Sequence, residues 1–325
     1  MRECLGQVAG GAGRICLFYT ALLKERRFRD MFKFLASKLQ HGRIWKRLLV
    51  ERFAEPLHLN LASVFVAMFG SVRAKTFFDL RIRPQHAFAL LTAADDALAF
   101  GYKSVTAIEF GVANGAGLLN ICELAEGVTR ETGIKFQIVG FDNAAGMPPI
   151  RDYRDHPELY QPGWYPMQDP ERLRNQLPPN AQLILGDIAA TVPGFLAALP
   201  ADSPIGFVSL DVDYYWSAVE ALKLFTGRPE QYLPRVTMYC DDVYSSAHNP
   251  WCGELAAIAD FNTQNAMRKI SPFNFLREER LFKRPKWISH MFTANVLDHP
   301  ARFTYLKDYG DVVLDNPYLG LKGRG

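Results

Sequence analysis

The feature that most constrains the fold is a series of five short apolar runs, which begins at residue 104. Each run is mostly apolar and does not alternate with polar residues, which is typical of strands that helices cover on both faces. Stretches of helical character separate the runs, and this predicts a doubly wound, mostly parallel α/β sheet. Near the end of the chain, WISHMFTANV (287–296) is a candidate for a further, antiparallel strand. The five runs are SVTAIEF (104–110), FQIVGF (136–141), AQLILG (181–186), GFVSLD (206–211) and RVTMYC (235–240).

The region before the first run has a different character. Residues 1–100 read as helical, with an amphipathic pattern over Phe18–Phe53, so we divide the chain into a helical N-terminal region and a sheet domain at 101–325. The segment Lys24–Arg52 carries ten Lys or Arg and three Asp or Glu. The simplest interpretation is a helix that packs on the main domain with a solvated basic face. Contact with a membrane surface or an anionic ligand is the alternative.

Composition restricts the possible binding partners and the cellular compartment of the protein. A formal net charge of +3 over 325 residues is too small to indicate nucleic-acid binding. The five cysteines include no C-x-x-C pair, which favours a reducing cytoplasm over a disulfide framework and suggests no zinc site. The run 5–23 contains Gln7, Arg14 and four glycines, so it falls short of a membrane span or a secretory signal. We therefore expect a soluble, cytoplasmic protein.

A glycine-rich loop follows the first apolar run, in IEFGVANGAG (108–117). Gly111 and Gly115 allow a tight turn from strand to helix, so that a ligand can approach the backbone at the helix N-terminus. The spacing is not the dinucleotide fingerprint G-x-G-x-x-G, because Ala113 stands where its second glycine would be. Glu109 precedes the loop, and a carboxylate there suits a ligand with a cationic amine better than a pyrophosphate.

Acidic residues end the next two runs. Asp142 stands where an acidic side chain can accept two hydrogen bonds from ribose hydroxyls. Asp187 stands at the usual place for holding an adenine amine. Each residue alone is weak support, because Asp at such a position often caps a helix. Together with Glu109 they outline a nucleoside with a cationic tail, for which S-adenosylmethionine is the natural candidate.

The fourth and fifth runs end in Asp-x-Asp and Asp-Asp. If these two strands are neighbours, Asp211, Asp241 and Asp242 converge at one edge of the sheet. Unpaired, these carboxylates would repel one another and be pushed toward protonation, and a divalent cation resolves that conflict. Ligands that are all oxygen favour Mg²⁺ over zinc. The alternative is a helix cap with a solvent-facing acid at 211–213 and a capped turn at 241–242.

These motifs resemble the class I S-adenosylmethionine-dependent methyltransferases, nearest to the macrocin and novobiocin-type O-methyltransferase group. The resemblance covers about residues 104–263. It implies a seven-stranded sheet, a cofactor at the carboxyl ends of the strands, and a divalent metal beside the methyl group. Sugar O-methyltransferases of this kind are often multimeric, so it also implies a homo-oligomer. The motifs are IEFGVANGAGLLN, VGFDNAAGMP, ILGD, LDVDYYWSAVEAL, YCDDV and GELAAIADFN.

The resemblance also implies roles for single residues. In metal-dependent O-methyltransferases of this kind, the cation orients a substrate hydroxyl and lowers its pKa, so that its oxygen attacks the sulfonium methyl in line. Asp213 is the candidate general base. Catechol-type relatives have a lysine near this position, and residues 211–216 contain none. The predicted cofactor-binding residues are Glu109, Gly111, Asn114, Gly115, Asp142, Asp187 and Asp211, and the predicted metal ligands are Asp211, Asp241 and Asp242.

The leading hypothesis is a Mg²⁺-dependent O-methyltransferase that acts on a hydroxyl of a small molecule, a sugar or a secondary metabolite. One alternative is an NAD-dependent oxidoreductase on a Rossmann-like sheet, against which stand the glycine spacing and the three acids. Another is a non-catalytic, methyltransferase-like binding module.

The segment 147–173 is dense in Pro and aromatic residues, which is typical of a lid or binding loop. Its aromatic residues are candidates for stacking on the acceptor or for a small core of the loop itself. His248 is either structural or part of the acceptor pocket. The aromatic residues are Tyr153, Tyr160, Trp164 and Tyr165.

Overall fold

The computed structural model describes residues 51–52, 55–245 and 247–303 of the 325-residue chain. The predicted amphipathic and basic segment at 18–53 lies outside the described residues except for positions 51–52, so its role stays a prediction. Among the helices of the described part, none is long and apolar enough to cross a membrane.

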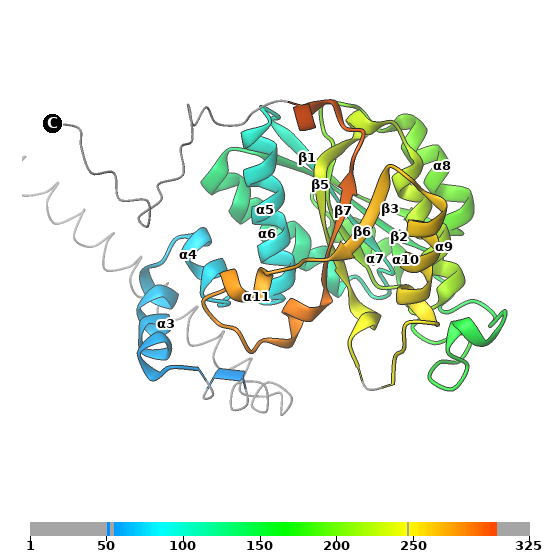
Figure 1. Cartoon of the computed structure of the whole chain (residues 1–325), viewed down its shortest axis with the longest axis horizontal. Helices are drawn as coiled ribbons and strands as arrows, with labels where there is room; N and C mark the ends of the chain where they lie inside the picture. The colour runs from blue at the N-terminus through cyan, green and yellow to red at the C-terminus, as the bar shows by residue number, and fades with distance from the viewer. Residues whose placement is uncertain (1–50, 53–54, 246, 304–325) are drawn as a thin grey trace, which may run out of the picture.

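Seven strands form one sheet at the centre of the structure (Figure 1). They are β1 (Ser104–Phe110), β2 (Lys135–Asp142), β3 (Ala181–Leu185), β4 (Ile205–Leu210), β5 (Tyr232–Cys240), β6 (Arg268–Pro272) and β7 (Met291–Val296). Their order is β3-β2-β1-β4-β5-β7-β6. β1 to β5 pair in parallel, and β7 runs antiparallel to both β5 and β6. The predicted seven-stranded, mostly parallel sheet is thereby confirmed.

The five apolar runs correspond to β1–β5. The further strand at 287–296 is also present and antiparallel, but it begins only at Met291, because Lys286–His290 forms a 3-10 turn. β6 was not predicted from the sequence. This strand is short, lies at the edge of the sheet and ends in Pro272, which is tolerated there because an edge strand leaves some backbone N–H groups unpaired.

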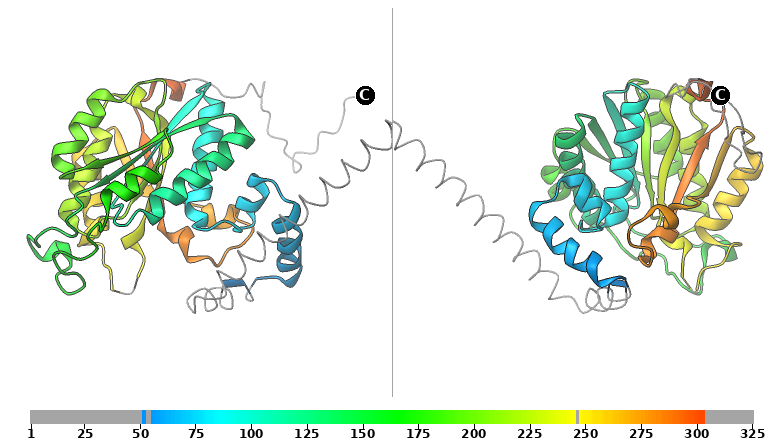
Figure 2. Two further views of the ribbon diagram at one scale, coloured as in Figure 1. Left: turned by 180° about the vertical axis from the view of Figure 1, so that it is seen from behind. Right: turned by 60° about the vertical axis from the view of Figure 1, so that its left-hand side comes forward.

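Helices cover both faces of the sheet (Figure 2). α5 and α6 pack on one face, and α8, α9 and α10 pack on the other. α4 lies beside α5 and α6, and α3 packs on α4, as Figure 1 shows. The helices are α3 (Leu57–Phe69), α4 (Val72–Phe77), α5 (Pro84–Ala99), α6 (Ala116–Thr132), α7 (Pro170–Gln176), α8 (Ile188–Ala198), α9 (Tyr215–Leu222), α10 (Gly253–Gln264) and α11 (Leu276–Glu279).

α5 belongs to the core of the sheet domain. Its Leu90 and Ala94 are fully buried and share one apolar cluster with Ala107 of β1 and Phe207 of β4. A helix from the predicted N-terminal region is therefore part of the packed unit. The division at residue 100 stays a prediction for the residues before α3.

The register of the parallel strands brings their carboxyl ends together. Phe110 pairs with Leu210, and Leu210 pairs with Cys240. The residues that directly follow these strands, among them Asp211 and Asp241, therefore lie side by side at one edge of the sheet.

Candidate functional site

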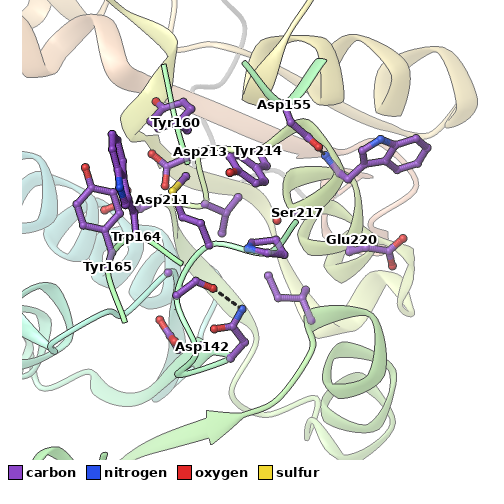
Figure 3. A pocket seen from close by; sticks show the side chains of 18 of the residues that line it. Asp142, Asp155, Tyr160, Trp164, Tyr165, Asp211, Asp213, Tyr214, Ser217 and Glu220 are labelled. Atoms are coloured by element: carbon purple, nitrogen blue, oxygen red, sulfur yellow. Dashed lines mark hydrogen bonds between the residues drawn. The ribbon is translucent and has the colours of Figure 1, made fainter. Parts of the chain in front are cut away.

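A cavity of about 510 Å³ lies at this edge of the sheet (Figure 3). Residues at the ends of β1, β2, β4 and β5, residues of α8 and α9, and the segment 147–173 form its walls. The predicted site residues that line it are Gly111, Asp142, Asp187, Asp211, Asp213, Asp241 and Asp242. The other predicted cofactor residues, Glu109, Asn114 and Gly115, belong to β1 and the loop after it and do not line this cavity.

Gly111 allows the ends of β1 and β4 to approach one another. Its φ is +82°, and a Cβ at this position would lie 1.7 Å from the backbone oxygen of Asp211. No side chain fits there, so the backbone of Asp211 requires a glycine at this position. The cavity wall at this point consequently consists of main chain.

Two of the predicted cofactor residues contact the segment 147–173. Gly115 precedes α6 with a φ of +85°, and a Cβ there would lie 2.3 Å from Cδ1 of Leu173. The side-chain oxygen of Asn114 accepts a hydrogen bond from the backbone N–H of Gln168, at 3.0 Å. Both residues hold this segment against the loop after β1, and their assignment to the cofactor stays a prediction.

Glu109 lies beneath the glycine loop, 3% exposed. A Cβ on Gly117 would lie 1.8 Å from Glu109 Oε1, so the first turn of α6 packs directly on the carboxyl group. Its Oε2 has no hydrogen-bond partner among the described residues. Burial raises the pKa of Glu109 to about 8, the charge of Arg83 opposes this rise, and Asp142 adds to it. A buried carboxyl group of this kind needs either a proton or a cationic partner.

Asp142 and Asp187 have local structural roles and also line the cavity. Asp142 accepts hydrogen bonds from the backbone N–H groups of Ala113, at 2.8 Å, and Ala144, at 2.6 Å. Asp187 caps α8 by accepting from the N–H of Ala189, at 2.9 Å. A carboxylate oxygen can accept more than one hydrogen bond, so these contacts orient both groups and leave capacity for a ligand. The capping and ligand-binding interpretations are therefore compatible.

The predicted metal ligands form a carboxylate cluster, which we define as Asp211, Asp241 and Asp242. One oxygen from each lies within 4.8 Å of the others. Burial, and then the charges of Asp241 and Asp242, raise the pKa of Asp211 well above its usual value. Oδ2 of Asp242 is buried and has no hydrogen-bond donor among the described residues. The cluster therefore fits a hard divalent cation, which would relieve the repulsion between the carboxylates and occupy this free oxygen.

A fourth acid, Glu254 of α10, binds the backbone next to the cluster. It is fully buried and accepts hydrogen bonds from the backbone N–H groups of Val212, at 3.4 Å, and Asp242, at 3.3 Å. Burial and the charges of Asp242 and Asp211 raise its pKa well above the usual value. Glu254 belongs to the motif GELAAIADFN, and no role was predicted for it from the sequence.

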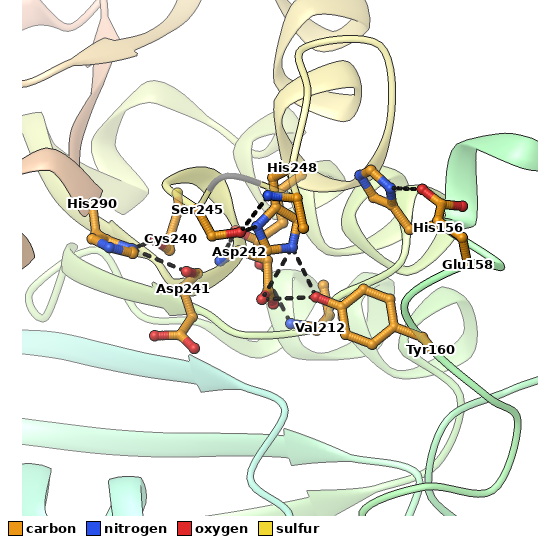
Figure 4. Close-up of polar contacts among 12 residues, drawn as sticks. His156, Glu158, Tyr160, Val212, Cys240, Asp241, Asp242, Ser245, His248 and His290 are labelled. Atoms are coloured by element: carbon orange, nitrogen blue, oxygen red, sulfur yellow. Dashed lines mark hydrogen bonds and ion pairs between the residues drawn. The ribbon is translucent and has the colours of Figure 1, made fainter. Parts of the chain in front are cut away.

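Other polar side chains contact the two acids that directly follow β5 (Figure 4). The hydroxyl of Tyr239 donates to Oδ1 of Asp241. Nδ1 of His290 lies 3.0 Å from the carbonyl oxygen of Asp241 and 3.1 Å from that of Cys240. Nδ1 must carry the proton, because both partners are acceptors only. Neither residue was predicted: Tyr239 belongs to β5 and stands two residues before Asp241, whereas His290 reaches the cluster because β7 pairs with β5.

Asp213 lies beside the carboxylate cluster in the cavity wall. Its φ is 57°, a left-handed conformation that is uncommon for residues other than glycine. Burial, followed by the charge of Asp242, raises its pKa to about 8. A carboxyl group with a pKa near neutrality is suited to exchange protons with a substrate.

The segment 147–173 lines the cavity opposite the sheet. Tyr160, Trp164 and Tyr165 contribute to the lining, whereas Tyr153 lies outside it and is 69% exposed. The segment is fixed to α9, because Trp216 donates its backbone N–H to Asp155, at 3.2 Å, and its indole N–H to Asp152, at 3.1 Å. It is therefore an ordered wall of the cavity.

Comparison with known proteins gives matches among solved structures alone. No protein-family model matches the sequence, and no curated protein is significantly similar to it. The crystal structure of CalS11, a calicheamicin methyltransferase, is 23% identical over 54% of this chain and 69% of its own, with a TM-score of 0.40. The O-methyltransferase TomG from Streptomyces achromogenes, solved with SAM, is 12% identical over 74% of this chain and 90% of its own, with a TM-score of 0.34.

The plantazolicin methyltransferase BpumL, solved with SAH, is 14% identical over 77% of this chain and 96% of its own, with a TM-score of 0.29. These three neighbours are methyltransferases, and two of them were solved with SAM or SAH. The TM-scores of these three neighbours are below 0.5, so the function is inferred from the residues of the site.

Proposed function

We propose that this chain is an S-adenosylmethionine-dependent O-methyltransferase that uses Mg²⁺ and acts on a hydroxyl of a small molecule, a sugar or a secondary metabolite. The observation that carries the proposal is that one cavity is lined by Asp142 and Asp187, which we assign to the nucleoside, and by the carboxylate cluster. A cytoplasmic location and a homo-oligomeric state are part of the proposal.

The cofactor would lie along the carboxyl ends of β1–β4. Asp142 would accept hydrogen bonds from the ribose hydroxyls, and Asp187 would bind the adenine amine. Glu109, whose Oε2 has no partner among the described residues, is suited to the ammonium group of the amino-acid tail. The cationic sulfonium group favours a wall rich in carboxylates, which would repel the pyrophosphate of a dinucleotide.

Asp211, Asp241 and Asp242 would hold the cation. When bound, the cation would orient the acceptor hydroxyl and lower its pKa. Asp213 would take the hydroxyl proton on a carboxylate oxygen as the acceptor oxygen bonds to the methyl carbon. The bond from that carbon to the sulfonium sulfur breaks, which leaves a methyl ether and S-adenosylhomocysteine. Trp164 and Tyr165, which line the opposite wall, would pack against the acceptor.

The oxidoreductase alternative has less support. The dinucleotide-binding sheet has the order 3-2-1-4-5-6. Here the antiparallel strand β7 lies between β5 and β6. The carboxylate cluster also has no role in hydride transfer.

Calorimetric titration with S-adenosylhomocysteine, in Mg²⁺ and again in EDTA, tests the cofactor assignment. We expect micromolar or tighter binding, and a screen of hydroxylated acceptors would then follow. Absence of binding in both buffers would refute the methyltransferase proposal.

Replacement of Asp241 tests the metal assignment, because this residue has no predicted contact with the cofactor. Since loss of a partner that merely orients a metal ligand costs about 10- to 100-fold, we expect Asp241→Asn to lower methyl transfer by at least about 100-fold. Affinity for S-adenosylhomocysteine in EDTA should be retained. Asp202→Asn, an exposed acid in the turn before β4, is the matched control and should transfer methyl groups as the wild type does. Full activity of Asp241→Asn would contradict the assignment.

A further inference from the structure

The side chain of Tyr160 joins the segment 147–173 to the carboxylate cluster. Its hydroxyl oxygen lies 2.9 Å from Oδ1 of Asp242 and 2.9 Å from Nε2 of His248 (Figure 4). Nδ1 of His248 in turn lies 2.7 Å from the hydroxyl of Ser245. Residues from the segment 147–173 and from the loop after β5 therefore meet at one ligand of the cluster.

The hydrogen bonds in this group have one consistent direction. Asp242 only accepts when ionised, so Tyr160 donates its single proton to Asp242. The tyrosine oxygen then accepts from His248, which places the imidazole proton on Nε2. Nδ1 of His248 is left to accept from Ser245. This assignment follows from the network, since each hydroxyl has one proton to donate.

The bond from Tyr160 selects which oxygen of Asp242 is available. It occupies Oδ1, whereas Oδ2 is buried and has no donor among the described residues. The backbone N–H of Asp242 is held separately by Glu254, at 3.3 Å. Asp242 is thus held at its backbone and at one carboxyl oxygen, and its other carboxyl oxygen is free for a cation.

Ring contacts hold Tyr160 in place independently of its hydroxyl. Its ring stacks on that of His248, with centroids 6.3 Å apart and planes at 26°. It also meets the ring of Tyr214 edge-on, at 6.0 Å and 62°. A phenylalanine at this position would retain these ring contacts and lose the hydroxyl's bonds to Asp242 and His248.

We propose that Tyr160 is a positioning residue that orients Asp242 for the cation and fastens the segment 147–173 to the carboxylate cluster. Cation binding and the observed position of this segment in the cavity wall then stabilise one another, because coupling between two sites is reciprocal. The inference rests on the proposed metal site and adds that the metal and the cavity wall are linked through one hydroxyl.

The test uses the full-length protein without acceptor. Free Mn²⁺ is measured by electron paramagnetic resonance during titration of the wild type and of Tyr160→Phe. We expect the variant to bind Mn²⁺ about 10-fold more weakly, which is the lower end of the effect of losing a partner that orients a metal ligand. Tyr153→Phe, in the same segment but exposed and outside the cavity lining, is the matched control and should bind as the wild type does.

The second readout is tryptic cleavage after Arg151 and Arg154, within the segment. Mn²⁺ should slow this cleavage in the wild type and in Tyr153→Phe, and should have little effect in Tyr160→Phe. Affinity for S-adenosylhomocysteine in EDTA should be the same in all three proteins, which a general structural defect would not allow.

The outcomes separate this inference from the proposed function. If the wild type binds no Mn²⁺, the metal assignment and the inference both fail. If the wild type binds Mn²⁺, and Tyr160→Phe has the same affinity and the same protection from trypsin, only the inference fails. Loss of both Mn²⁺ and S-adenosylhomocysteine binding in Tyr160→Phe would overturn it in favour of a purely structural role.

Discussion

Single residues at the ends of the strands carry both structural and chemical constraints. Asp142 and Asp187 illustrate this at the residue scale, since each satisfies backbone N–H groups and also faces the cavity. Gly111 carries the strongest backbone constraint, because its position next to Asp211 excludes even a methyl group. The local sequence predicts a glycine turn here. What requires the glycine is the backbone of Asp211, which follows a strand one hundred residues further along the chain.

Gly111→Ala should strongly destabilise the protein. Adopting a left-handed conformation costs a residue with a Cβ about 1–2 kcal/mol, and the overlap with the Asp211 backbone adds to this cost. Gly133→Ala is the matched control, because Gly133 has a φ of +79° and no atom within 4 Å of a Cβ. Gly133→Ala should lose only the stability that the left-handed backbone conformation costs. Urea unfolding of both variants measures the difference, and equal losses would show that the close approach is unimportant.

At the scale of elements, the tertiary packing of α5 assigns it to the sheet domain and not to an N-terminal extension. The sequence predicts that residues 84–99 are helical, as they are, and assigns them to an N-terminal extension. In the structure one face of this helix lies on the sheet, where His86 contacts the rings of Phe207 and Tyr239 at 5.8 Å each. Burial lowers the pKa of His86 to about 3, so it is neutral and acts as an aromatic core residue.

Leu90→Ala should reveal the contribution of α5 to stability. Leu90 is fully buried against the sheet, so loss of its side chain leaves a cavity, which costs about 2–5 kcal/mol. Leu98→Ala on the same helix removes a side chain that is 58% exposed and should cost far less. Urea unfolding midpoints compare the two. A small effect at Leu90 would mean that α5 packs on the sheet only loosely.

At the scale of the whole molecule, the sheet concentrates negative charge at one edge. Burial and neighbouring acids raise the pKa values of Asp211, Asp242 and Glu254. A raised carboxyl pKa means that the folded protein binds more protons than the unfolded chain. Stability of the metal-free protein therefore falls as the pH rises above the usual carboxyl range.

Mg²⁺ should reverse this loss. At a concentration of 100 times its Kd, a cation that binds only the folded state stabilises it by about 2.7 kcal/mol. We expect the rise in Tm on addition of Mg²⁺ to be larger at pH 8 than at pH 6, because protons compete with the cation at the lower pH. Thermal unfolding in Mg²⁺ and in EDTA measures the rise at each pH, with Asp241→Asn as the control that should not respond. An equal rise at both pH values would contradict the expectation.

The sequence by itself determined the strands β1–β5 and the acids at their ends. These features are local: an apolar run marks a buried strand, and parallel strands place their carboxyl ends at one edge. Only the tertiary structure decided which partners surround the acids. Glu254, His290 and Tyr160 reach the cluster from other elements, and no spacing along the chain predicts those contacts. The same holds for Asn114 and Gly115, which contact the segment 147–173 because α7 packs on the start of α6.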